Sequence, residues 1–280
     1  DLSNETTLVE LSRNLAATVG PDWHALPLLA DGSTAGVTRP ILNPADHRDK
    51  VGRVTEVQPE DAARIVKAAA DHAAQWAAVA PAERAARLDR AADIMQSRIE
   101  TLMGIIIREA GKSAANAIGE GREAIDFLRY YAEQARKTLG PAHESLGPVV
   151  CISPWNFPLA IFTGKVAAAL VAGNPVLAKP ADSTPIIASE SVKILHEAGV
   201  PAGALQLVPG DGRVGAALVG ADDVAGVMFT GSTEVARLIQ SQLSRRLSPA
   251  GKPIPLIAET GGQNAMIVDS SALAEQVVAD

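Results

Sequence analysis

The stretch "VVCISPWNFPLAIFTGKVAAALVAGNPVLAKP", residues 149–180, holds two short apolar runs with a helical stretch between them. This is the length that a strand, a crossover helix and a returning parallel strand require. Further apolar runs follow, also separated by helical stretches: "ALQLVPG", "VAGVMFTG", "PIPLIAETGG" and "NAMIVD". Continuous apolar strands joined by helices indicate a parallel sheet covered on both faces. The sequence therefore predicts an α/β fold.

Composition narrows the class of protein. The 280 residues are 47% hydrophobic, which is enough for one large domain or two ordinary ones with a buried core. The formal net charge is -7 and the basic residues are scattered, so nucleic acid is a poor candidate partner. One cysteine excludes an internal disulfide, and the five histidines lack metal-ligand spacing, so no metal site is predicted.

No apolar run is long enough to span a membrane, and the start lacks a signal peptide, so we expect a cytoplasmic protein.

Three regions follow one another along the chain. Residues 1–58 are punctuated by Gly and Pro and are interpreted as a leading arm with short turns and a strand or two. Residues 59–140 are predicted to be helical. The helices are expected to begin at Pro59, at Pro81 and at about Gly121, and Gly111 is expected to end the second one. Residues 141–280 contain the predicted sheet, including a helix that starts at Pro185 after Ser183 or Thr184 as N-cap.

Ligands of such sheets bind where the carboxyl ends of strands meet helix N-termini. The polar residues directly after the apolar runs are therefore the candidate site residues: 153–157, 179–182, 210–215, 230–233 and 259–264. Lys179 and Asp182 could bracket a ribose or a phosphate, and they could equally be a solvated strand end and a helix-capping acid. The glycine loop with Gly212 and Gly215 could bring backbone close to a pyrophosphate, or could be a tight turn.

Two of these strand ends carry groups suited to catalysis. Glu259 leaves an apolar run and is followed by two glycines, so we expect burial to raise its pKa toward that of a general base. A carboxylate bonded to backbone amides is the structural alternative. Asn156 lies between two prolines, which would fix its amide as an oxyanion donor, although a structural turn would look similar. "FTGSTE" could hold an anion by its backbone N–H groups, or could be an ordinary capped helix.

Taken in order, "PWNFPL", "AKPADSTP", "PGDGRVG", "FTGSTEVAR" and "AETGGQNA" resemble motifs of the NAD(P)-dependent aldehyde dehydrogenase superfamily, over residues 43–280. Residues 151–181 and 256–280 are most similar to the L-glutamate γ-semialdehyde (1-pyrroline-5-carboxylate) dehydrogenase module of bacterial bifunctional proline utilization proteins. The resemblance implies the N-terminal part of the aldehyde dehydrogenase fold. This is a Rossmann-like NAD-binding domain preceded by a helical segment.

The resemblance also implies a function. In the intact parent, L-glutamate γ-semialdehyde would be oxidised to L-glutamate with NAD, as a step of proline catabolism. Asn156 would hold the oxyanion, and Glu259 would be the general base. The residues implied to contact the cofactor are Ile152, Ser153, Pro154, Trp155, Lys179, Ala181, Asp182, Gly212, Gly215, Phe229, Thr230, Gly231, Ser232, Glu259 and Gly261. Asp182 replaces a more usual Glu and should repel the 2′-phosphate of NADP, which favours NAD.

Several partners are implied by the same resemblance. The substrate would be a small-molecule aldehyde, and a proline dehydrogenase domain with FAD would belong to the same parent chain, while homo-oligomerisation stays open. The family nucleophile is a cysteine in a separate catalytic domain, which would fall beyond residue 280, so this chain alone is expected to be inactive. The glycine loop has one residue fewer between Gly212 and Gly215 than many family members.

Three other functions are alternatives for this sequence. One is another aldehyde dehydrogenase, such as one acting on succinic semialdehyde, and a second is a non-catalytic NAD-binding fragment. A third is a hydrolase that uses Cys151 with a histidine such as His143. We interpret Cys151 as structural, because it lies inside an apolar strand where burial should raise the thiol pKa.

Overall fold

The computed structural model describes residues 4–140, 142–263 and 265–279, so Pro141 at the predicted region boundary and Asn264 lie outside the description. Its centre is a five-stranded sheet in the order β6-β5-β4-β7-β8, and every pair in it is parallel. The strands are β4 (Val149–Ile152), β5 (Val176–Lys179), β6 (Leu205–Leu207), β7 (Gly226–Gly231) and β8 (Leu256–Thr260). The predicted α/β fold with a parallel sheet is confirmed.

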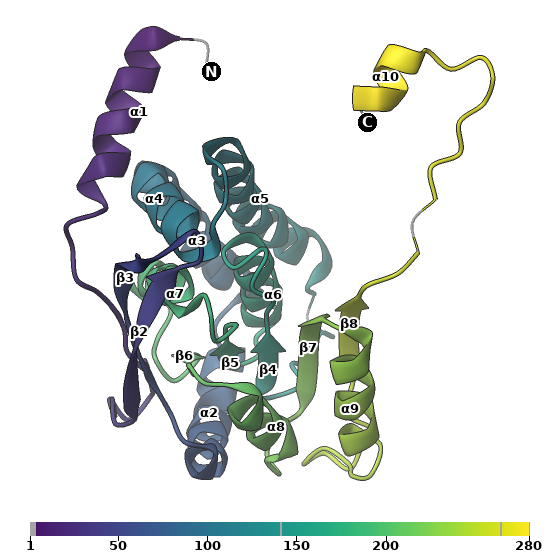
Figure 1. Cartoon of the computed structure of the whole chain (residues 1–280). Coiled ribbons are helices and arrows are strands. Elements are labelled where there is room, and N and C mark those ends of the chain that lie inside the picture. The colour runs from purple at the N-terminus through teal and green to yellow at the C-terminus, as the bar shows by residue number, and fades with distance from the viewer. Residues whose placement is uncertain (1–3, 141, 264, 280) are drawn as a thin grey trace.

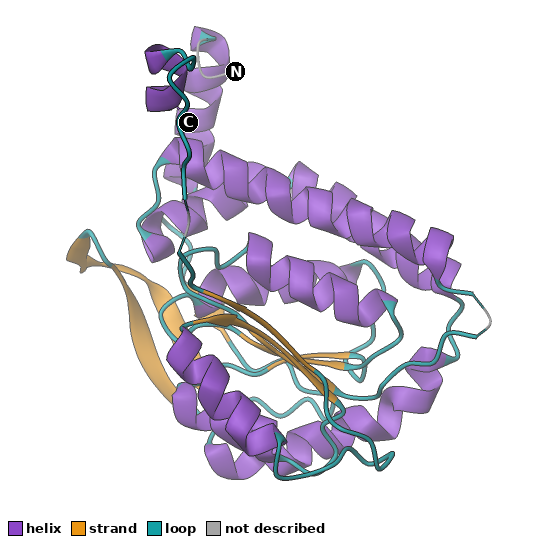
Figure 2. Cartoon of the chain, turned by 90° about the vertical axis from the view of Figure 1, so that its right-hand side faces the viewer, coloured by secondary structure: helices purple, strands orange, loops and turns teal. Residues whose placement is uncertain are grey.

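Helices cover both faces of this sheet (Figures 1 and 2). On one face lie α2 (Ala62–Ala77), α8 (Gly212–Gly220) and α9 (Thr233–Leu243), and on the other α6 (Ala160–Val171) and α7 (Pro185–Glu197). An outer layer over α6 and α7 is formed by α3 (Pro81–Ser97), α4 (Ile99–Ala110) and α5 (Ala114–Thr138). Of the predicted helical segment, α2 thus packs directly on the sheet, whereas α3, α4 and α5 pack on helices of the sheet.

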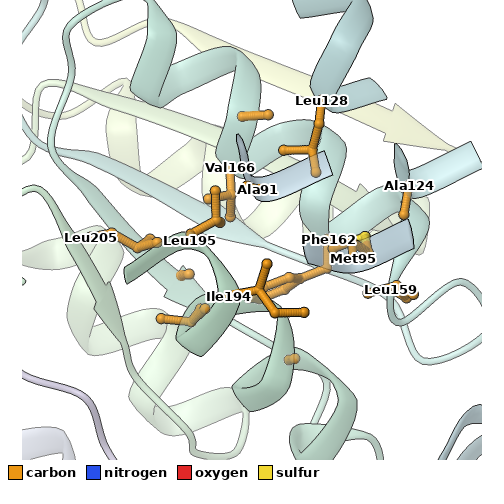
Figure 3. Close-up of a cluster of buried hydrophobic side chains, with 14 of the residues drawn as sticks. Ala91, Met95, Ala124, Leu128, Leu159, Phe162, Val166, Ile194, Leu195 and Leu205 are labelled. Atoms are coloured by element: carbon orange, nitrogen blue, oxygen red, sulfur yellow. The ribbon is translucent and has the colours of Figure 1, made fainter. Parts of the chain in front are cut away.

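Buried side chains join the outer helical layer to the helices of the sheet. Figure 3 shows part of this cluster, with side chains from α3, α5, the start of α6, α6 itself, α7 and β6 in one group. The labelled residues are Ala91, Met95, Ala124, Leu128, Leu159, Phe162, Val166, Ile194, Leu195 and Leu205. All of them are at most 1% exposed, so the outer layer and the sheet share one core.

The helical segment differs in detail from its prediction. The helix expected from Pro81 to Gly111 is two helices, because the chain breaks at Arg98 without a Gly or Pro to mark the break. Gly111 ends α4 as expected and has a φ of 67°, a conformation that glycine adopts readily. The third helix begins earlier than predicted, since the Ser113 side chain accepts a hydrogen bond from the Asn116 N–H and caps the helix at Ala114.

The first region contains more regular structure than expected. Helix α1 (Glu5–Ala17) was not predicted, and a second sheet in the order β1-β3-β2 contains β1 (Trp23–Ala25), β2 (Val37–Asn43) and β3 (Asp46–Glu56). The end of this sheet reaches the glycine loop, because the Val57 N–H donates to the Pro209 carbonyl (3.0 Å). The leading region therefore contributes backbone close to one predicted ligand-binding turn.

One predicted strand is wrong. The run "NAMIVD" forms no strand over its described residues 265–269, and Ile267 is 94% exposed. This segment leads away from the rest of the chain to the short helix α10 (Ala274–Ala279) (Figure 1). An apolar run becomes a strand only beside another strand, and among the described residues no strand pairs with it. Within the described residues, no helix is long and apolar enough to cross a membrane.

The N-terminus of α7 is capped by a residue that lies far away in sequence. Thr184 is the N-cap residue, but its side chain makes no capping bond. Instead the Glu109 carboxylate of α4 accepts from the Ile186 N–H (2.7 Å) and the Ile187 N–H (2.9 Å). Burial raises the pKa of Glu109 to about 8, and the two N–H bonds oppose that shift. The helical layer thereby holds the start of a helix of the sheet.

Candidate functional site

A cleft of about 670 Å³ lies at the carboxyl ends of the central strands. It is lined by the end of β4 and the loop after it, by Ala181 after β5, by the end of β7 and by the end of β8. The predicted site residues that line it are Ile152, Ser153, Pro154, Trp155, Asn156, Ala181, Phe229, Thr230, Gly231, Ser232, Glu259 and Gly261. The structure therefore brings Asn156 and Glu259 to one cleft, together with most of the residues expected to contact the cofactor.

The loop after β4 forms one wall of the cleft. The Ser153 N–H donates to the Lys179 carbonyl at the end of β5 (3.2 Å), which ties the start of the loop to the neighbouring strand. Trp155 and Asn156 are exposed beyond that tie, and the chain is buried again from Pro158 onward. The amide of Asn156 is thus presented to solvent and to the cleft by a loop fixed at both ends.

The end of β7 and the start of α9 form the floor between the two walls. The Ser232 hydroxyl accepts from the Val235 N–H (3.2 Å), so Ser232 is the N-cap of α9. The interpretation of "FTGSTE" as an ordinary capped helix is confirmed. The start of this helix also lines the cleft, and anion binding by its N–H groups stays a prediction. The positive end of the helix dipole favours an anionic group there.

Four predicted residues lie beside the cleft rather than on it: Lys179, Asp182, Gly212 and Gly215. The Lys179 side chain is buried, donates from Nζ to the Pro180 carbonyl (2.7 Å) and passes close to Gly215. A Cβ on Gly215 would lie 3.3 Å from Cδ of Lys179, so a larger residue would crowd that side chain. Burial lowers the pKa of Lys179 to about 8, while Asp182, Asp211 and Glu56 oppose the shift.

The glycine loop has its own cap. The Asp211 carboxylate accepts from the Arg213 N–H (2.8 Å) and the Val214 N–H (3.4 Å), and α8 begins at Gly212. These two N–H groups are therefore already bonded within the chain. Gly212 has open space around it, whereas Gly215 packs on Lys179. Of the two glycines, Gly215 is the one whose lack of a side chain the packing requires.

Glu259 differs from its prediction in burial. The sequence predicted a desolvated carboxylate, but Glu259 is exposed at the end of the edge strand β8. Its position is fixed by the parallel pairing of β8 with β7, in which Glu259 lies opposite Thr230. The expected burial was wrong for the described residues, because Gly261 and the chain that follows do not cover the carboxylate.

Lys165 is a candidate that sequence reasoning missed. It lies in α6 and lines a second cavity of about 410 Å³ that also reaches Phe229, Thr230 and Glu259. Its Nζ donates to the Ile152 carbonyl (2.5 Å), and burial lowers its pKa to about 7, with Cys151 and Glu259 opposing the shift. Lys165 and Glu259 therefore line one cavity from a helix and from the edge strand. The available signal was a single lysine inside the apolar helix "AIFTGKVAAALV".

The hydrolase alternative is not supported. Cys151 is fully buried in the middle of the sheet, and burial raises the pKa of its thiol to about 12. His143 belongs to the segment that precedes β4, and its ring lies within hydrogen-bonding distance of the Ala172 carbonyl (2.8 Å). A thiol with that pKa stays protonated at neutral pH and is a poor nucleophile. In the described part of the chain, no three His, Cys, Asp or Glu side chains gather as a metal-binding group.

Comparison with known proteins agrees with this geometry. Residues 32–280 match the model of the "Aldehyde dehydrogenase family". The chain is 68% identical over 280 residues to the bifunctional protein PutA of Rhizobium meliloti, covering 100% of this chain and 22% of that protein. It is 36% identical to 1-pyrroline-5-carboxylate dehydrogenase 2 of Bacillus subtilis, covering 94% of this chain and 55% of that protein.

A solved structure shows the same fold. The crystal structure of proline utilization A (PutA) from Bdellovibrio bacteriovorus superposes with a TM-score of 0.87 at 31% sequence identity, covering 92% of this chain and 29% of that one. This chain thus spans 22% of the length of the Rhizobium meliloti protein and about half the length of the Bacillus subtilis one.

Proposed function

The chain belongs to the aldehyde dehydrogenase family, and on that premise we propose that it supplies the nucleotide-binding part of an L-glutamate γ-semialdehyde (1-pyrroline-5-carboxylate) dehydrogenase. The intact parent would oxidise L-glutamate γ-semialdehyde to L-glutamate in proline catabolism. The choice of substrate is supported by the names of the similar proteins, which include 1-pyrroline-5-carboxylate dehydrogenase 2 of Bacillus subtilis.

The observation that carries the proposal is the shared cleft. Asn156 and Glu259 come from strands that are not neighbours in the sheet, and yet both line one cavity with the ends of β4 and β7. An amide N–H donor on one wall suits a developing oxyanion, and an accessible carboxylate on the other suits the activation of water. Oxidation of an aldehyde to an acid requires both functions, so the arrangement is consistent with that reaction.

The residues beside the cleft fit a dinucleotide. Lys179 is buried next to a glycine, where the absence of a Cβ leaves room for its side chain, and the start of α9 offers a positive helix end. We propose that Lys179 and Asp182 hold the adenosine ribose and that Gly231 and Ser232 lie by the pyrophosphate. When bound, the cofactor accepts a hydride from the substrate carbon.

We propose NAD rather than NADP as the cofactor. Three carboxylates, those of Asp182, Asp211 and Glu56, act on Lys179 strongly enough to oppose the lowering of its pKa. Two nearby cations are already engaged: Arg39 with Glu56 (2.7 Å) and with the Asp182 carbonyl (2.5 Å), and Arg213 with Asp211 (2.8 Å). The charge around the ribose position is thus unfavourable for an added 2′-phosphate.

The remaining components would lie outside this sequence. Because Cys151 is buried and protonated, we propose that the nucleophilic cysteine belongs to a catalytic domain in the rest of the parent protein. We also propose a proline dehydrogenase domain with FAD in the same parent and a cytoplasmic location, as the similarity to a bifunctional PutA protein suggests. Homo-oligomerisation of the parent is proposed from the family resemblance.

The test is steady-state kinetics of the intact parent protein. We expect NAD-dependent oxidation of 1-pyrroline-5-carboxylate with a kcat/KM that exceeds the value for succinic semialdehyde by roughly 100-fold. A higher kcat/KM for succinic semialdehyde would contradict the proposed substrate, while the chain would still belong to the aldehyde dehydrogenase family. An intact protein that binds NAD but oxidises neither aldehyde would overturn the proposal in favour of a non-catalytic binding module.

A further inference from the structure

The start of α6 is capped from outside its own segment, by Glu120 of α5. Oε1 of Glu120 accepts from the Leu159 N–H (2.8 Å) and the Ala160 N–H (3.3 Å). Leu159 is the N-cap residue of α6 and makes no side-chain capping bond of its own. Because helix N-terminal N–H groups need an acceptor, Glu120 fixes where α6 begins. The loop that carries Asn156 ends at that point.

Lys112 completes this anchor. Its Nζ forms an ion pair with Oε2 of Glu120 (2.5 Å) and lies 3.9 Å from the centre of the Phe157 ring. The Glu120 side chain is 0% exposed and the Lys112 side chain 13%, so water screens the pair little. A cation on an aromatic face and an ion pair of this kind both fix side-chain position. Lys112 therefore contacts the residue directly after Asn156 and the carboxylate that caps the following helix.

The loop thus has one anchor on each side of Asn156. On the side of Ser153 the anchor is the sheet, through the Lys179 carbonyl. On the side of Phe157 and Leu159 it is the Lys112–Glu120 pair of the helical layer. Asn156 itself is exposed, so the place of its amide depends on where the loop backbone holds its Cα.

We propose that Lys112 and Glu120 are positioning residues for Asn156, which hold its amide at the place of the developing oxyanion. The proposal rests on the function proposed above for Asn156. Neither residue lines the cleft, so both act through the loop and neither touches the substrate. Since the oxyanion forms in the transition state, loss of this support lowers kcat more than it raises the KM for NAD.

Glu109 provides an internal comparison. It also caps a helix of the sheet from the helical layer, but the helix is α7, which follows the turn of Lys179 and Asp182. A loss of the Glu109 cap is therefore expected to raise the KM for NAD and to leave kcat nearly unchanged. Each glutamate caps a helix of the sheet, Glu120 next to the loop of Asn156 and Glu109 next to the turn proposed to bind the cofactor. Comparing their variants therefore distinguishes an effect on the amide of Asn156 from an effect on cofactor binding.

The kinetic experiment uses Lys112→Met in the intact parent protein. We expect kcat to fall roughly 10- to 100-fold, because small misplacements of a catalytic group cost up to that much, with the KM for NAD within about 2-fold. Lys112→Arg keeps the charge and the contact with the ring, and it should restore kcat to within about 5-fold of wild type. Glu197→Gln breaks the exposed Arg98–Glu197 ion pair between the same two layers and serves as the matched control without effect.

A double variant tests the route of the effect. If Lys112 acts through Asn156, Lys112→Met should lower kcat little further in an Asn156→Ala background. Equal losses in both backgrounds would overturn the proposal, because a merely structural role of Lys112 would add to the loss of Asn156. A wild-type kcat for Lys112→Met would overturn it as well.

Hydrogen exchange provides a readout that does not depend on activity. In Lys112→Met and Glu120→Gln, peptides covering residues 153–160 should exchange at least about 10-fold faster, with peptides of β4 and β5 unchanged. Unchanged exchange at 153–160 would overturn the inference even if kinetics changed. If the wild-type protein lacks aldehyde oxidation, the proposed function fails, and increased exchange would still support the anchoring of the loop by Lys112 and Glu120.

Discussion

The two walls of the cleft are built in different ways. The wall that carries Asn156 is backed by buried groups, among them the Lys112–Glu120 pair and the fully buried side chains of α6. The wall that carries Glu259 is an edge strand bonded on one side to β7, and its residues from Ile257 onward are exposed. One wall is therefore part of the core, and the other is placed mainly by backbone pairing with β7, with Leu256 packed against the core where β8 begins.

Because of this difference, substitutions in the two walls should affect different quantities, the free energy of unfolding in one and the rate of reaction in the other. A substitution in the buried wall removes packing or a hydrogen bond that the fold needs, so it should change the free energy of unfolding. A substitution of the exposed Glu259 removes a group that the fold does not need, so it should change the reaction and leave the fold intact. The following variants of the intact parent protein test that separation.

The largest loss of stability is expected from Phe162→Ala in α6. Phe162 is 0% exposed and lies in the cluster between the helical layer and the sheet (Figure 3). Removing a buried aromatic ring leaves a cavity, and the expected cost is about 4 kcal/mol of unfolding free energy. Thermal unfolding of the variant measures it, with Val235→Ala on the exposed face of α9 as control. A melting temperature equal to that of wild type would mean that the core does not join the two layers.

Glu259→Gln should have the opposite profile. We expect kcat to fall about 10²- to 10³-fold, roughly 3 to 4 kcal/mol, because an amide cannot accept a proton from water at neutral pH. The melting temperature should stay within about 1 °C, since the side chain is exposed. Kinetics and thermal unfolding of one preparation give both values. A variant that is destabilised but retains wild-type kcat would show that Glu259 serves the fold and not the reaction.

Glu109→Gln should change the pH dependence of stability. Below about pH 4.5 the carboxyl is protonated in both the folded and the unfolded chain. Between that value and a folded pKa of about 8, the unfolded chain loses the proton and the folded chain keeps it, so the free energy of unfolding falls as pH rises.

The expected slope of this loss is about 1.4 kcal/mol per pH unit, and it should be absent in the glutamine variant. Thermal unfolding of both proteins at pH 5, 6, 7 and 8 measures the difference. The control is Glu197→Gln, which replaces an exposed carboxylate at the other end of α7, the helix that Glu109 caps. A wild-type stability advantage that grows with pH would show that the N–H bonds from Ile186 and Ile187 outweigh burial.

Gly215→Ala should have the smallest effect. Its new Cβ would press on Lys179, which must move by a few tenths of an ångström. We expect NAD binding to weaken roughly 10-fold, about 1.4 kcal/mol, with the fold retained. Calorimetric titration with NAD measures the affinity, and Gly119→Ala on α5, where the new Cβ meets no atom within 4 Å, is the control. An unchanged affinity for NAD would contradict the proposed contact between Lys179 and the cofactor.

The sheet could be predicted from sequence because its signals are local. Each of five apolar runs pairs with a neighbour, and the turns after β4, β5, β7 and β8 meet in one cleft, with the glycine loop after β6 beside it. The same local signal failed at residues 265–269, which are apolar but have no strand beside them. The hairpin of β2 and β3 was underestimated for the converse reason, since a polar segment such as "DHRDKVGRVTE" forms a strand through pairing.

The missed parts of the site depend on contacts between distant residues. Glu120 and Leu159 are 39 positions apart, and Glu109 and Ile186 are 77 positions apart, so no local pattern marks either cap. Lys165 was hidden by the apolar residues around it, because helical periodicity does not reveal which buried position faces a cavity. The exposure of Glu259 likewise depends on what covers an edge strand, and its own residues do not encode that.

The burial of Cys151 has a practical consequence for chemical labelling. It is the only cysteine of this sequence, and its thiol is fully buried with a pKa of about 12. Alkylating reagents attack the thiolate, so a native protein should resist modification along this whole chain. A thiol-directed probe applied to the intact parent would therefore report on cysteines elsewhere, without background from residues 1–280.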